Sequence, residues 1–366
     1  MRLSEIKKTL QENLNYNVDV TFREFKKKNK KLMIVYIQDC IDSNLLSISV
    51  INPILSTKKE LSIDSLIKDI IFVAGAEKLK RIDEVIKEIL QGNAVLFIDG
   101  ANEFLKLAVA NIEKRSIVEP PTSAVIYGPR EGFVESIKIN TSLIRKRLPT
   151  TSLKMIEMNL GRYTKTKVRI FYLNDIADKK VVDRIEKQLQ KIDIDGVIDS
   201  HYLLSFLEEQ KNSIFKQVGK TEKPDVLVSK MLEGRVGIMV DGSPIALTLP
   251  FILLEDIQNS DDYYQKSFRI SFIRMIRLFG IIFSIILPGA YVAVQTMHYR
   301  VIPIRFLITL MDSIQGLPFT PLLEMLFVVM LFEILYESSL RMPKYLGMAL
   351  GIVGALILGD TAVKAG

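Results

Sequence analysis

The uneven distribution of charge constrains this chain more than any other feature of its sequence. From Met1 to about Phe268 charged side chains recur every few positions, whereas beyond Arg277 they nearly vanish and apolar runs take over. Leu278 to Met297 is a stretch of about twenty residues without a charge, which as a helix spans the ~30 Å hydrocarbon core of a bilayer. The sequence therefore predicts a water-compatible N-terminal portion joined to a C-terminal helical membrane domain.

The apolar portion, residues 278–366, is predicted to cross the membrane three times. The residues before it, 261–277, alternate basic and apolar side chains and predict an amphipathic interfacial helix, whose positive charge favours a cytoplasmic N-terminal portion. A lone cysteine, Cys40, and an N-terminus without an apolar leader favour the same side. The predicted spans are residues 278–297, 321–336 and 346–363.

Acidic residues inside the predicted spans are the candidates for an ion path or gate. Each charge costs roughly 2.5–3.5 kcal/mol at a helix centre on insertion scales, so its presence calls for a reason. Glu333, Glu337 and Arg341 follow at four-residue intervals and share one helix face. The simpler alternative is that Glu337 pairs with Arg341 near the cytoplasmic boundary. The acidic candidates are Glu324, Glu333, Glu337 and Asp360, and Pro288 of the first span completes the set.

Two further features of the predicted spans concern helix geometry. Pro288 lies near the middle of the first span, where a proline removes one helix hydrogen bond. The resulting break either serves a pathway or is a kink tolerated by neighbouring helices. The third span is rich in small residues, which let helix backbones approach closely. Its predicted packing residues are Gly347, Gly351 and Gly354.

The N-terminal portion contains an internal duplication. ILQGNAVLFIDGA at residues 89–101 aligns with MLEGRVGIMVDGS at 231–243, and VYIQDCID at 35–42 aligns with FYLNDIAD at 171–178. In each copy a glycine ends a helical pattern, an apolar run predicts a buried strand, and Asp-Gly predicts a hairpin turn. The sequence therefore predicts two related mixed-sheet α/β lobes. The predicted boundaries are residues 1–119 for the first lobe, 120–150 for a linker and helix, and 151–260 for the second lobe.

No catalytic, cofactor or metal site is predicted. Gly-Lys-Thr at residues 219–221 resembles the end of a phosphate loop, but Ile214 stands where the first glycine of that motif belongs. The two histidines and Cys40 lack metal-ligand spacing. The basic run at residues 145–147 is interpreted as solvated surface, with lipid headgroups or a partner as the alternative. The net charge of +7 is spread among almost as many acids, so nucleic acid is not an expected partner.

Several strings in this chain resemble the A subunit of the GerA family of bacterial spore germinant receptors. They are GPREGFVES (128–136), GRYTKTKV (161–168), TEKPD (221–225), LEGRVGIMVDGSP (232–244) and LPGAYVAV (287–294). The resemblance implies a non-enzymatic, multi-pass protein of the spore inner membrane, without a cofactor. It also implies that the protein acts with a transporter-like B subunit and a lipoprotein C subunit. The family's membrane domain continues beyond residue 366, so the resemblance implies that further helices are missing here.

Three hypotheses about function follow. In the first, an oligomer of A subunits is a germinant-gated, ion-conducting component that triggers ion release, and ligand shifts a closed-to-open equilibrium. In the second, the chain is a non-conducting scaffold whose cytoplasmic lobes couple a transporter-like subunit to downstream partners. In the third, the duplicated lobes bind a ligand themselves, which predicts an apolar cleft between them.

Overall fold

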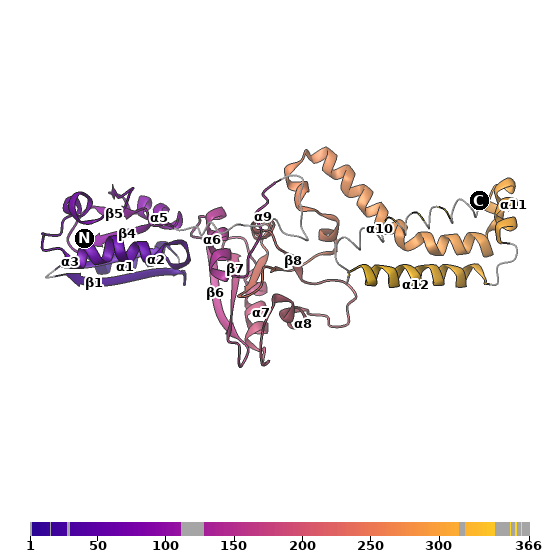
Figure 1. Ribbon diagram of the computed structural model, residues 1–366, viewed down its shortest axis with the longest axis horizontal. Helices are drawn as coiled ribbons and strands as arrows, with labels where there is room; N and C mark the ends of the chain where they lie inside the picture. Colours follow the sequence, from indigo (N-terminus) through magenta and orange to yellow (C-terminus); the bar gives the residue numbers. More distant parts are fainter. Residues whose placement is uncertain are drawn as a thin grey trace. The chain divides into compact units, whose positions relative to one another are not determined.

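The structure, a computed structural model, describes residues 2–14, 16–27, 30–110, 128–314 and 319–340, together with residues 352, 356 and 360. These residues form two compact units, 1–265 and 266–366. The first unit contains two lobes, each built around a five-stranded sheet (Figure 1).

The first lobe has the strand order β1-β2-β4-β5-β3, with every pair antiparallel. Its strands are β1 (Val20–Lys27), β2 (Lys30–Ile37), β3 (Glu77–Leu79), β4 (Ala94–Ile98) and β5 (Phe104–Leu107). Its helices are α1 (Leu3–Asn13), η1 (Gln38–Cys40), α2 (Ser43–Leu46), η2 (Ser47–Ile51), α3 (Asn52–Ser56), α4 (Ile63–Ser65), η3 (Leu66–Ile70) and α5 (Ile82–Leu90).

Helices cover both faces of this sheet, because its central strands are apolar on both sides. Side chains alternate across a strand, so Leu32 and Ile34 of β2 pack under the short helices between β2 and β3. Met33 and Val35 of the same strand face the other way, against α1 and α5. A strand buried on both faces therefore appears as the continuous apolar run that the sequence shows.

The second lobe repeats this arrangement, with the strand order β6-β7-β9-β10-β8. Its strands are β6 (Leu153–Leu160), β7 (Thr166–Leu173), β8 (Gly219–Thr221), β9 (Val236–Val240) and β10 (Ala246–Leu249). Its helices are α6 (Ile137–Arg147), α7 (Lys179–Gln190), η4 (Ser200–Leu203), α8 (Leu204–Leu207) and α9 (Pro224–Leu232), followed by η5 (Leu253–Ile257) and η6 (Ser260–Tyr264).

The duplication predicted from the sequence is confirmed, but the sheets are antiparallel rather than mixed. The long connection from β2 to β4 leaves and re-enters at the same end of the sheet, since Val35 pairs with Val95 near the end of one strand and the start of the other. The connection from β7 to β9 does the same. Such a connection makes an antiparallel pair, and the apolar runs alone did not reveal it.

The Asp-Gly pairs form the predicted hairpin turns, and they also have a second role. Gly100 and Gly242 adopt φ angles of +81° and +91°, which favour glycine. The carboxylate of Asp99 accepts a hydrogen bond from the backbone N–H of Leu3 at 3.2 Å, and Asp241 accepts one from Ile137 at 3.1 Å. Each turn therefore supplies an acceptor for the first residue of α1 or α6.

These paired hydrogen bonds identify α6 as the counterpart of α1. The sequence predicted a linker and helix in residues 120–150, and the structure places α6 in the core of the second lobe, where Ile144 and Leu148 belong to the same buried cluster as the sheet residue Phe171. Strand β8, which contains the Gly-Lys-Thr string, pairs with β10 at the sheet edge.

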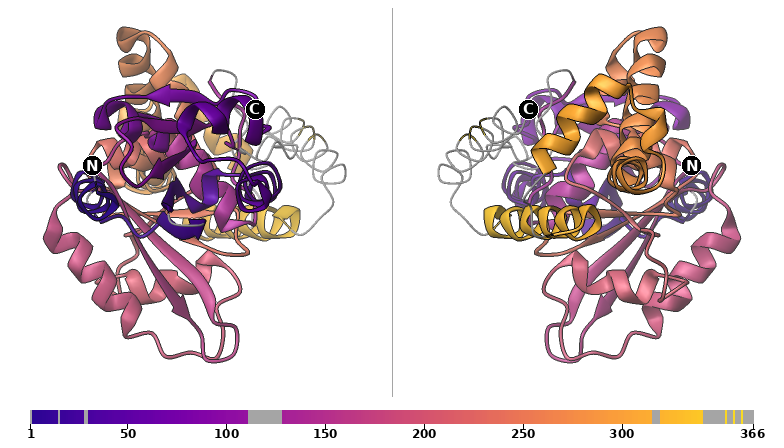
Figure 2. Two further views of the ribbon diagram at one scale, coloured as in Figure 1. Left: turned by 90° about the vertical axis from the view of Figure 1, so that its left-hand side faces the viewer. Right: turned by 90° about the vertical axis from the view of Figure 1, so that its right-hand side faces the viewer.

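The second unit is helical within its described residues (Figure 2). Helix α10 (Ser267–Thr296) includes most of the predicted interfacial run and the first predicted span without interruption, because no helix-breaking residue separates them. It is followed by η7 (Tyr299–Val301), α11 (Ile304–Ile314) and α12 (Pro321–Leu340). Among the described residues, α10 is the one helix long and apolar enough to cross a membrane.

Candidate functional site

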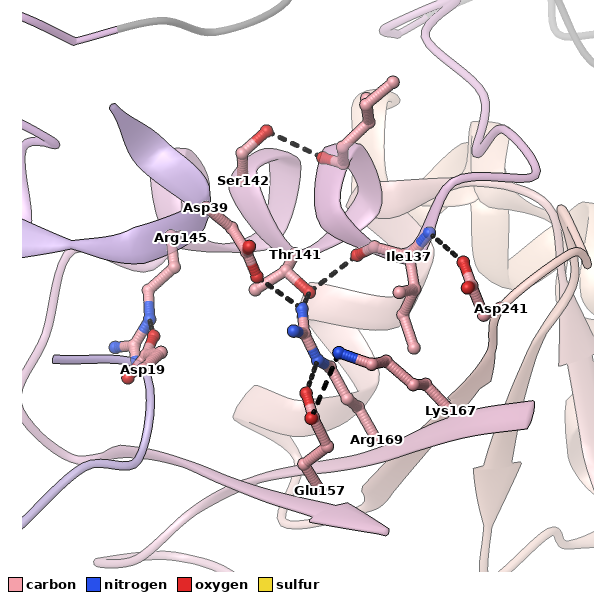
Figure 3. A network of polar contacts seen from close by, with 11 residues as sticks. Asp19, Asp39, Ile137, Thr141, Ser142, Arg145, Glu157, Lys167, Arg169 and Asp241 are labelled. Carbon is pink, nitrogen blue, oxygen red and sulfur yellow. Dashed lines mark hydrogen bonds and ion pairs between the residues drawn. The ribbon is translucent and has the colours of Figure 1, made fainter. Parts of the chain in front are cut away.

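The contact between the two lobes contains a buried ion pair. The Arg145 guanidinium on α6 donates to both carboxylate oxygens of Asp19, at 2.8 and 2.9 Å (Figure 3). Both side chains are 2% exposed. This bidentate pairing joins residues 126 positions apart, one from each lobe, and it satisfies charges that would be very costly to bury alone.

A second buried arginine joins the lobes beside the first. Arg169 on β7 donates from Nη1 to Asp39 of the first lobe at 2.5 Å and to the Thr141 hydroxyl at 2.7 Å. Its Nε donates to Glu157 on β6 at 2.8 Å, and Lys167 lies 3.5 Å from the same carboxylate (Figure 3). Arg169 and Asp39 are 6% and 4% exposed, so the ion pair that joins the lobes is enclosed, whereas Glu157 and Lys167 reach the surface.

The network controls the charge state of its members. Burial alone would raise the pKa of Glu157, but the hydrogen bond and positive charge of Arg169, helped by Lys167, lower the pKa overall. Burial works against a charged Arg169, yet Asp39 and Glu157 raise its pKa. Both groups are therefore held in their charged forms at the contact between the lobes.

Cys40 lies at the same contact. The thiol is buried, and burial raises its pKa to about 12 against the opposing charge of Arg145. It lines a cavity of about 270 Å³ together with residues from α6. The lining residues are Cys40, Leu90, Gln91, Gly92, Ser142, Arg145, Lys146 and Pro149. Polar side chains (Gln91, Ser142, Arg145 and Lys146) and apolar ones share this lining, and the cavity lies at the contact between the lobes.

The sequence did not reveal these residues. Arg145 sits in a basic run interpreted as solvated surface, and that interpretation is wrong for Arg145, because α6 packs against both the second lobe and η1. Lys146 is exposed. Arg169 had a usable signal, since it interrupts the apolar run of β7. Its partner Asp39 lies in one of the duplicated strings, but nothing in that string indicates a partner on the other lobe.

In the second unit, two of the predicted ion-path residues line one groove. Helices α10 and α12 pack alongside each other (Figure 1), and a groove of about 860 Å³ lies between them. Pro288 and Glu333 are both part of its lining, and the other residues are apolar or small, except for Thr296. Helix α10 continues through Pro288, which has no N–H to donate to the carbonyl of Ser284.

The remaining predicted residues are not brought to this groove. Glu337 lies on α12 and is exposed, and Glu324 is half-buried in the first turn of the same helix. Helix α12 carries three glutamates, Glu324, Glu333 and Glu337, among its 20 residues. Asp360 is helical and exposed. Gly347, Gly351, Gly354 and Arg341, together with most of the third predicted span, lie outside the described residues.

Comparison with known sequences identifies relatives along nearly the whole chain. The profile of the Bacillus/Clostridium GerA spore germination protein family matches residues 8–366. Spore germination protein KA of Bacillus subtilis (strain 168) is 34% identical over 354 residues, which cover 95% of this chain and 65% of that protein. Spore germination protein B1 of the same organism is 33% identical over 98% of this chain and 75% of that protein. The chain thus spans about two thirds to three quarters of the length of these relatives, neither of which is named as an enzyme.

A solved structure matches the first unit. The N-terminal domain of the A subunit of the Bacillus megaterium spore germinant receptor GerK3 superposes with a TM-score of 0.51 at 28% identity. The match covers 69% of this chain and 96% of that domain. The two-lobed fold, the family match and the shared identity lead to one conclusion: this chain belongs to the GerA family of spore germination proteins.

Proposed function

We propose that this chain is the A subunit of a nutrient-germinant receptor in the spore inner membrane, with its duplicated lobes on the cytoplasmic side. The observation that carries the proposal is the family match over residues 8–366, together with the likeness of the first unit to the N-terminal domain of a germinant-receptor A subunit. The apolar surface of α10, where Ile285 is 74% exposed, requires a covering of lipid or protein.

The receptor in this proposal is an assembly. The A subunits form an oligomer and act with a transporter-like B subunit and a lipoprotein C subunit. Germinant binding shifts the oligomer towards an ion-conducting state, and the multi-pass helices form the gate. The groove between α10 and α12 supports this assignment, because it presents an acidic side chain, Glu333, in otherwise largely apolar surroundings beside Pro288.

Disruption of the gene in the organism that encodes it tests the receptor role. Mutant spores should lose the response to at least one nutrient germinant, and the wild-type gene should restore it. A full response of the mutant spores to every nutrient that germinates the wild type would refute the proposal.

Glu333→Gln tests the ion path. The change keeps the shape of the side chain but removes its charge from the groove, so ion release from germinating spores should slow at normal protein levels. Asp312→Asn in α11 is the matched control, because it removes a similar charge away from the groove and should leave release normal. Normal release from Glu333→Gln would discard the assignment.

Conductance separates the receptor channel from the scaffold alternative. Full-length A subunit reconstituted in liposomes should pass ions if it conducts. A protein that inserts and assembles but passes no ions would favour a scaffold whose lobes couple the B subunit to other partners.

A further inference from the structure

The duplication gives each lobe two surfaces, and the contact within the chain uses only one from each. We call the surface formed by η1 and the end of α5 (residues 38–40 and 90–92), and its copy in the second lobe (174–176 and 232–234), the turn face. The surface formed by α6 with Glu157, and its copy formed by α1 with Glu24, is called the helix face. The turn face of lobe 1 contacts the helix face of lobe 2. The turn face of lobe 2 and the helix face of lobe 1 are not used by this contact.

Strand register makes the turn faces equivalent. Met33 pairs with Phe97 in lobe 1, and Arg169 pairs with Met239 at the equivalent place in lobe 2. Equivalent residues of β2 and β7 are therefore 136 positions apart in the sequence, and those of β4 and β9 are 142 positions apart. These offsets align Asp39 with Asp175, Cys40 with Ile176, and Leu90 with Leu232. Local packing agrees, because an added Cβ at Gly92 would meet Cys40, and one at Gly234 would meet Ile176.

The unused turn face exposes two large aliphatic side chains. Ile176 is 52% exposed and Leu232 is 53% exposed. Their counterparts Cys40 and Leu90 are 6% and 9% exposed. An exposed pair of large aliphatic residues at the position where the sister lobe makes a buried contact indicates a surface that another molecule covers.

The helix faces are also equivalent. The hydrogen bonds from Leu3 to Asp99 and from Ile137 to Asp241 align the first residues of α1 and α6, so that Lys7 in lobe 1 is equivalent to Thr141 in lobe 2. Val20 pairs with Ile37 and Leu153 with Leu173, so that Glu24 in lobe 1 is equivalent to Glu157 in lobe 2. The same alignments place Gln11 at the position of Arg145 and Ser152 at the position of Asp19.

The charges on the unused faces are complementary. In the contact within the chain, the cation of Arg169 lies between Glu157 and Asp39. On the free helix face, Lys7 supplies the cation and lies 2.7 Å from Glu24. On the free turn face, Asp175 is exposed, accepts a hydrogen bond from the Ser152 hydroxyl through one carboxylate oxygen, and occupies the position of Asp39. Asp175 meeting Lys7 and Glu24 would repeat the same pattern of one cation and two carboxylates.

We propose that the turn face of lobe 2 docks on the helix face of lobe 1 of a second copy of this chain, so that the contact within the chain is repeated between chains. This inference rests on the oligomeric receptor proposed above and names the surface that joins its subunits. The contact is head-to-tail, so copies related by it close into a ring or continue as an open array.

The contact between chains is weaker than the contact within one chain. The buried bidentate pair of Arg145 and Asp19 is replaced by Gln11 and Ser152, which removes a charge-assisted interaction. Ile176 and Leu232 supply apolar area in compensation. A reversible association is expected, strengthened where the chain is concentrated in a membrane.

Cysteine cross-linking tests the docking on the full-length chain in membranes. Cys40 and Ser142 line one cavity within the chain, and their counterparts on the free faces are Ile176 and Lys8. Membranes containing both Lys8→Cys chains and Ile176→Cys chains should yield dimers with a short bismaleimide. Either variant by itself should stay at the level of the wild type, whose Cys40 is buried.

Ile198→Cys is the matched control for Ile176→Cys. Ile198 is an exposed apolar residue of lobe 2, at 68%, and lies beside the Gly242 turn rather than on the turn face. Paired with Lys8→Cys it should give no dimer above background. The absence of dimers from the Lys8 and Ile176 pair, or equal dimers from the control pair, would overturn the proposal.

Charge reversal gives a second readout. Lys7→Glu places like charges opposite Asp175 and should reduce cross-linking to the level of the control pair. Asp175→Lys on the partner chain should restore it. An unchanged yield with Lys7→Glu would contradict the charge match. Docking and receptor function can be tested separately. If the chain forms these dimers but its gene is dispensable for germination, only the proposed function is refuted. If the gene is required for germination but no dimers form, only the docking is refuted.

Discussion

The strongest prediction concerns the buried pair that joins the lobes. Asp19→Asn keeps the size of the side chain but leaves the guanidinium of Arg145 facing a neutral amide. Both partners are 2% exposed, so water cannot replace the lost charge without opening the contact. The change should therefore weaken the contact between the lobes while leaving each lobe folded around its own core.

The magnitude follows from the burial. Breaking a buried ion pair by removing one partner costs roughly 3–5 kcal/mol. Asparagine still accepts one hydrogen bond, so the lower end, about 3 kcal/mol, is expected for Asp19→Asn. Since about 1.4 kcal/mol corresponds to a factor of ten, the population of the opened contact should rise roughly 100-fold. In Asp19→Asn combined with Arg145→Met no buried charge remains at the pair, so the two losses should be far from additive.

Cys40 is a native reporter for this opening. It is the one cysteine in the chain, it lines the same cavity as Arg145, and its pKa of about 12 prevents reaction in the closed state. On exposure the thiol returns to a pKa of ~8.5 and becomes reactive. The rate of alkylation of the full-length chain in detergent at mildly alkaline pH therefore measures the opening equilibrium, provided reclosing is faster than labelling.

Arg162→Met is the control, because Arg162 and Asp193 form an exposed pair on the second lobe and its loss should leave labelling unchanged. An alkylation rate for Asp19→Asn within about threefold of wild type, equivalent to less than 1 kcal/mol, would refute the claim that this pair holds the lobes together.

Three further predictions follow from the described residues. Because the pKa of Glu157 is lowered in the folded state, its stabilising effect is present above the unfolded pKa of about 4.3 and is lost as the pH falls further. The urea concentration at the unfolding midpoint, measured by circular dichroism, should therefore decrease when the pH is lowered from about 5 to about 3. This decrease should be smaller for Glu157→Gln. Gly128→Ala should destabilise the protein more than Gly100→Ala in thermal melts: both have positive φ, but a Cβ at Gly128 would lie 2.5 Å from the Tyr264 ring, whereas one at Gly100 meets nothing within 4 Å. Asp241→Ala should lower the melting temperature by removing the acceptor for the first N–H of α6, at a cost of about 1 kcal/mol, and Asp241→Asn should retain most of the stability. Equal effects within either matched pair would contradict the reasoning.

Much of the architecture was predictable because local sequence patterns specify it. The duplicated strings predicted two related lobes, since equal spacing of a helix end, a buried strand and an Asp-Gly turn specifies the same supersecondary unit twice. The apolar run from Leu278 predicted a long membrane-compatible helix, and α10 contains it. The direction of strand pairing was not predictable, because runs buried on both faces look alike in parallel and antiparallel sheets.

The sequence by itself determined the partition into a charged and an apolar portion, the repeat and the family, because each depends on the order of residue types along the chain. Only the tertiary structure decided that Arg145 is buried rather than solvated and that Arg169 joins the lobes. It also brought Pro288 and Glu333 to one groove. The physical reason is that an ion pair or a groove depends on which distant residues the fold brings together, and Asp19 lies 126 positions from the arginine that it neutralises.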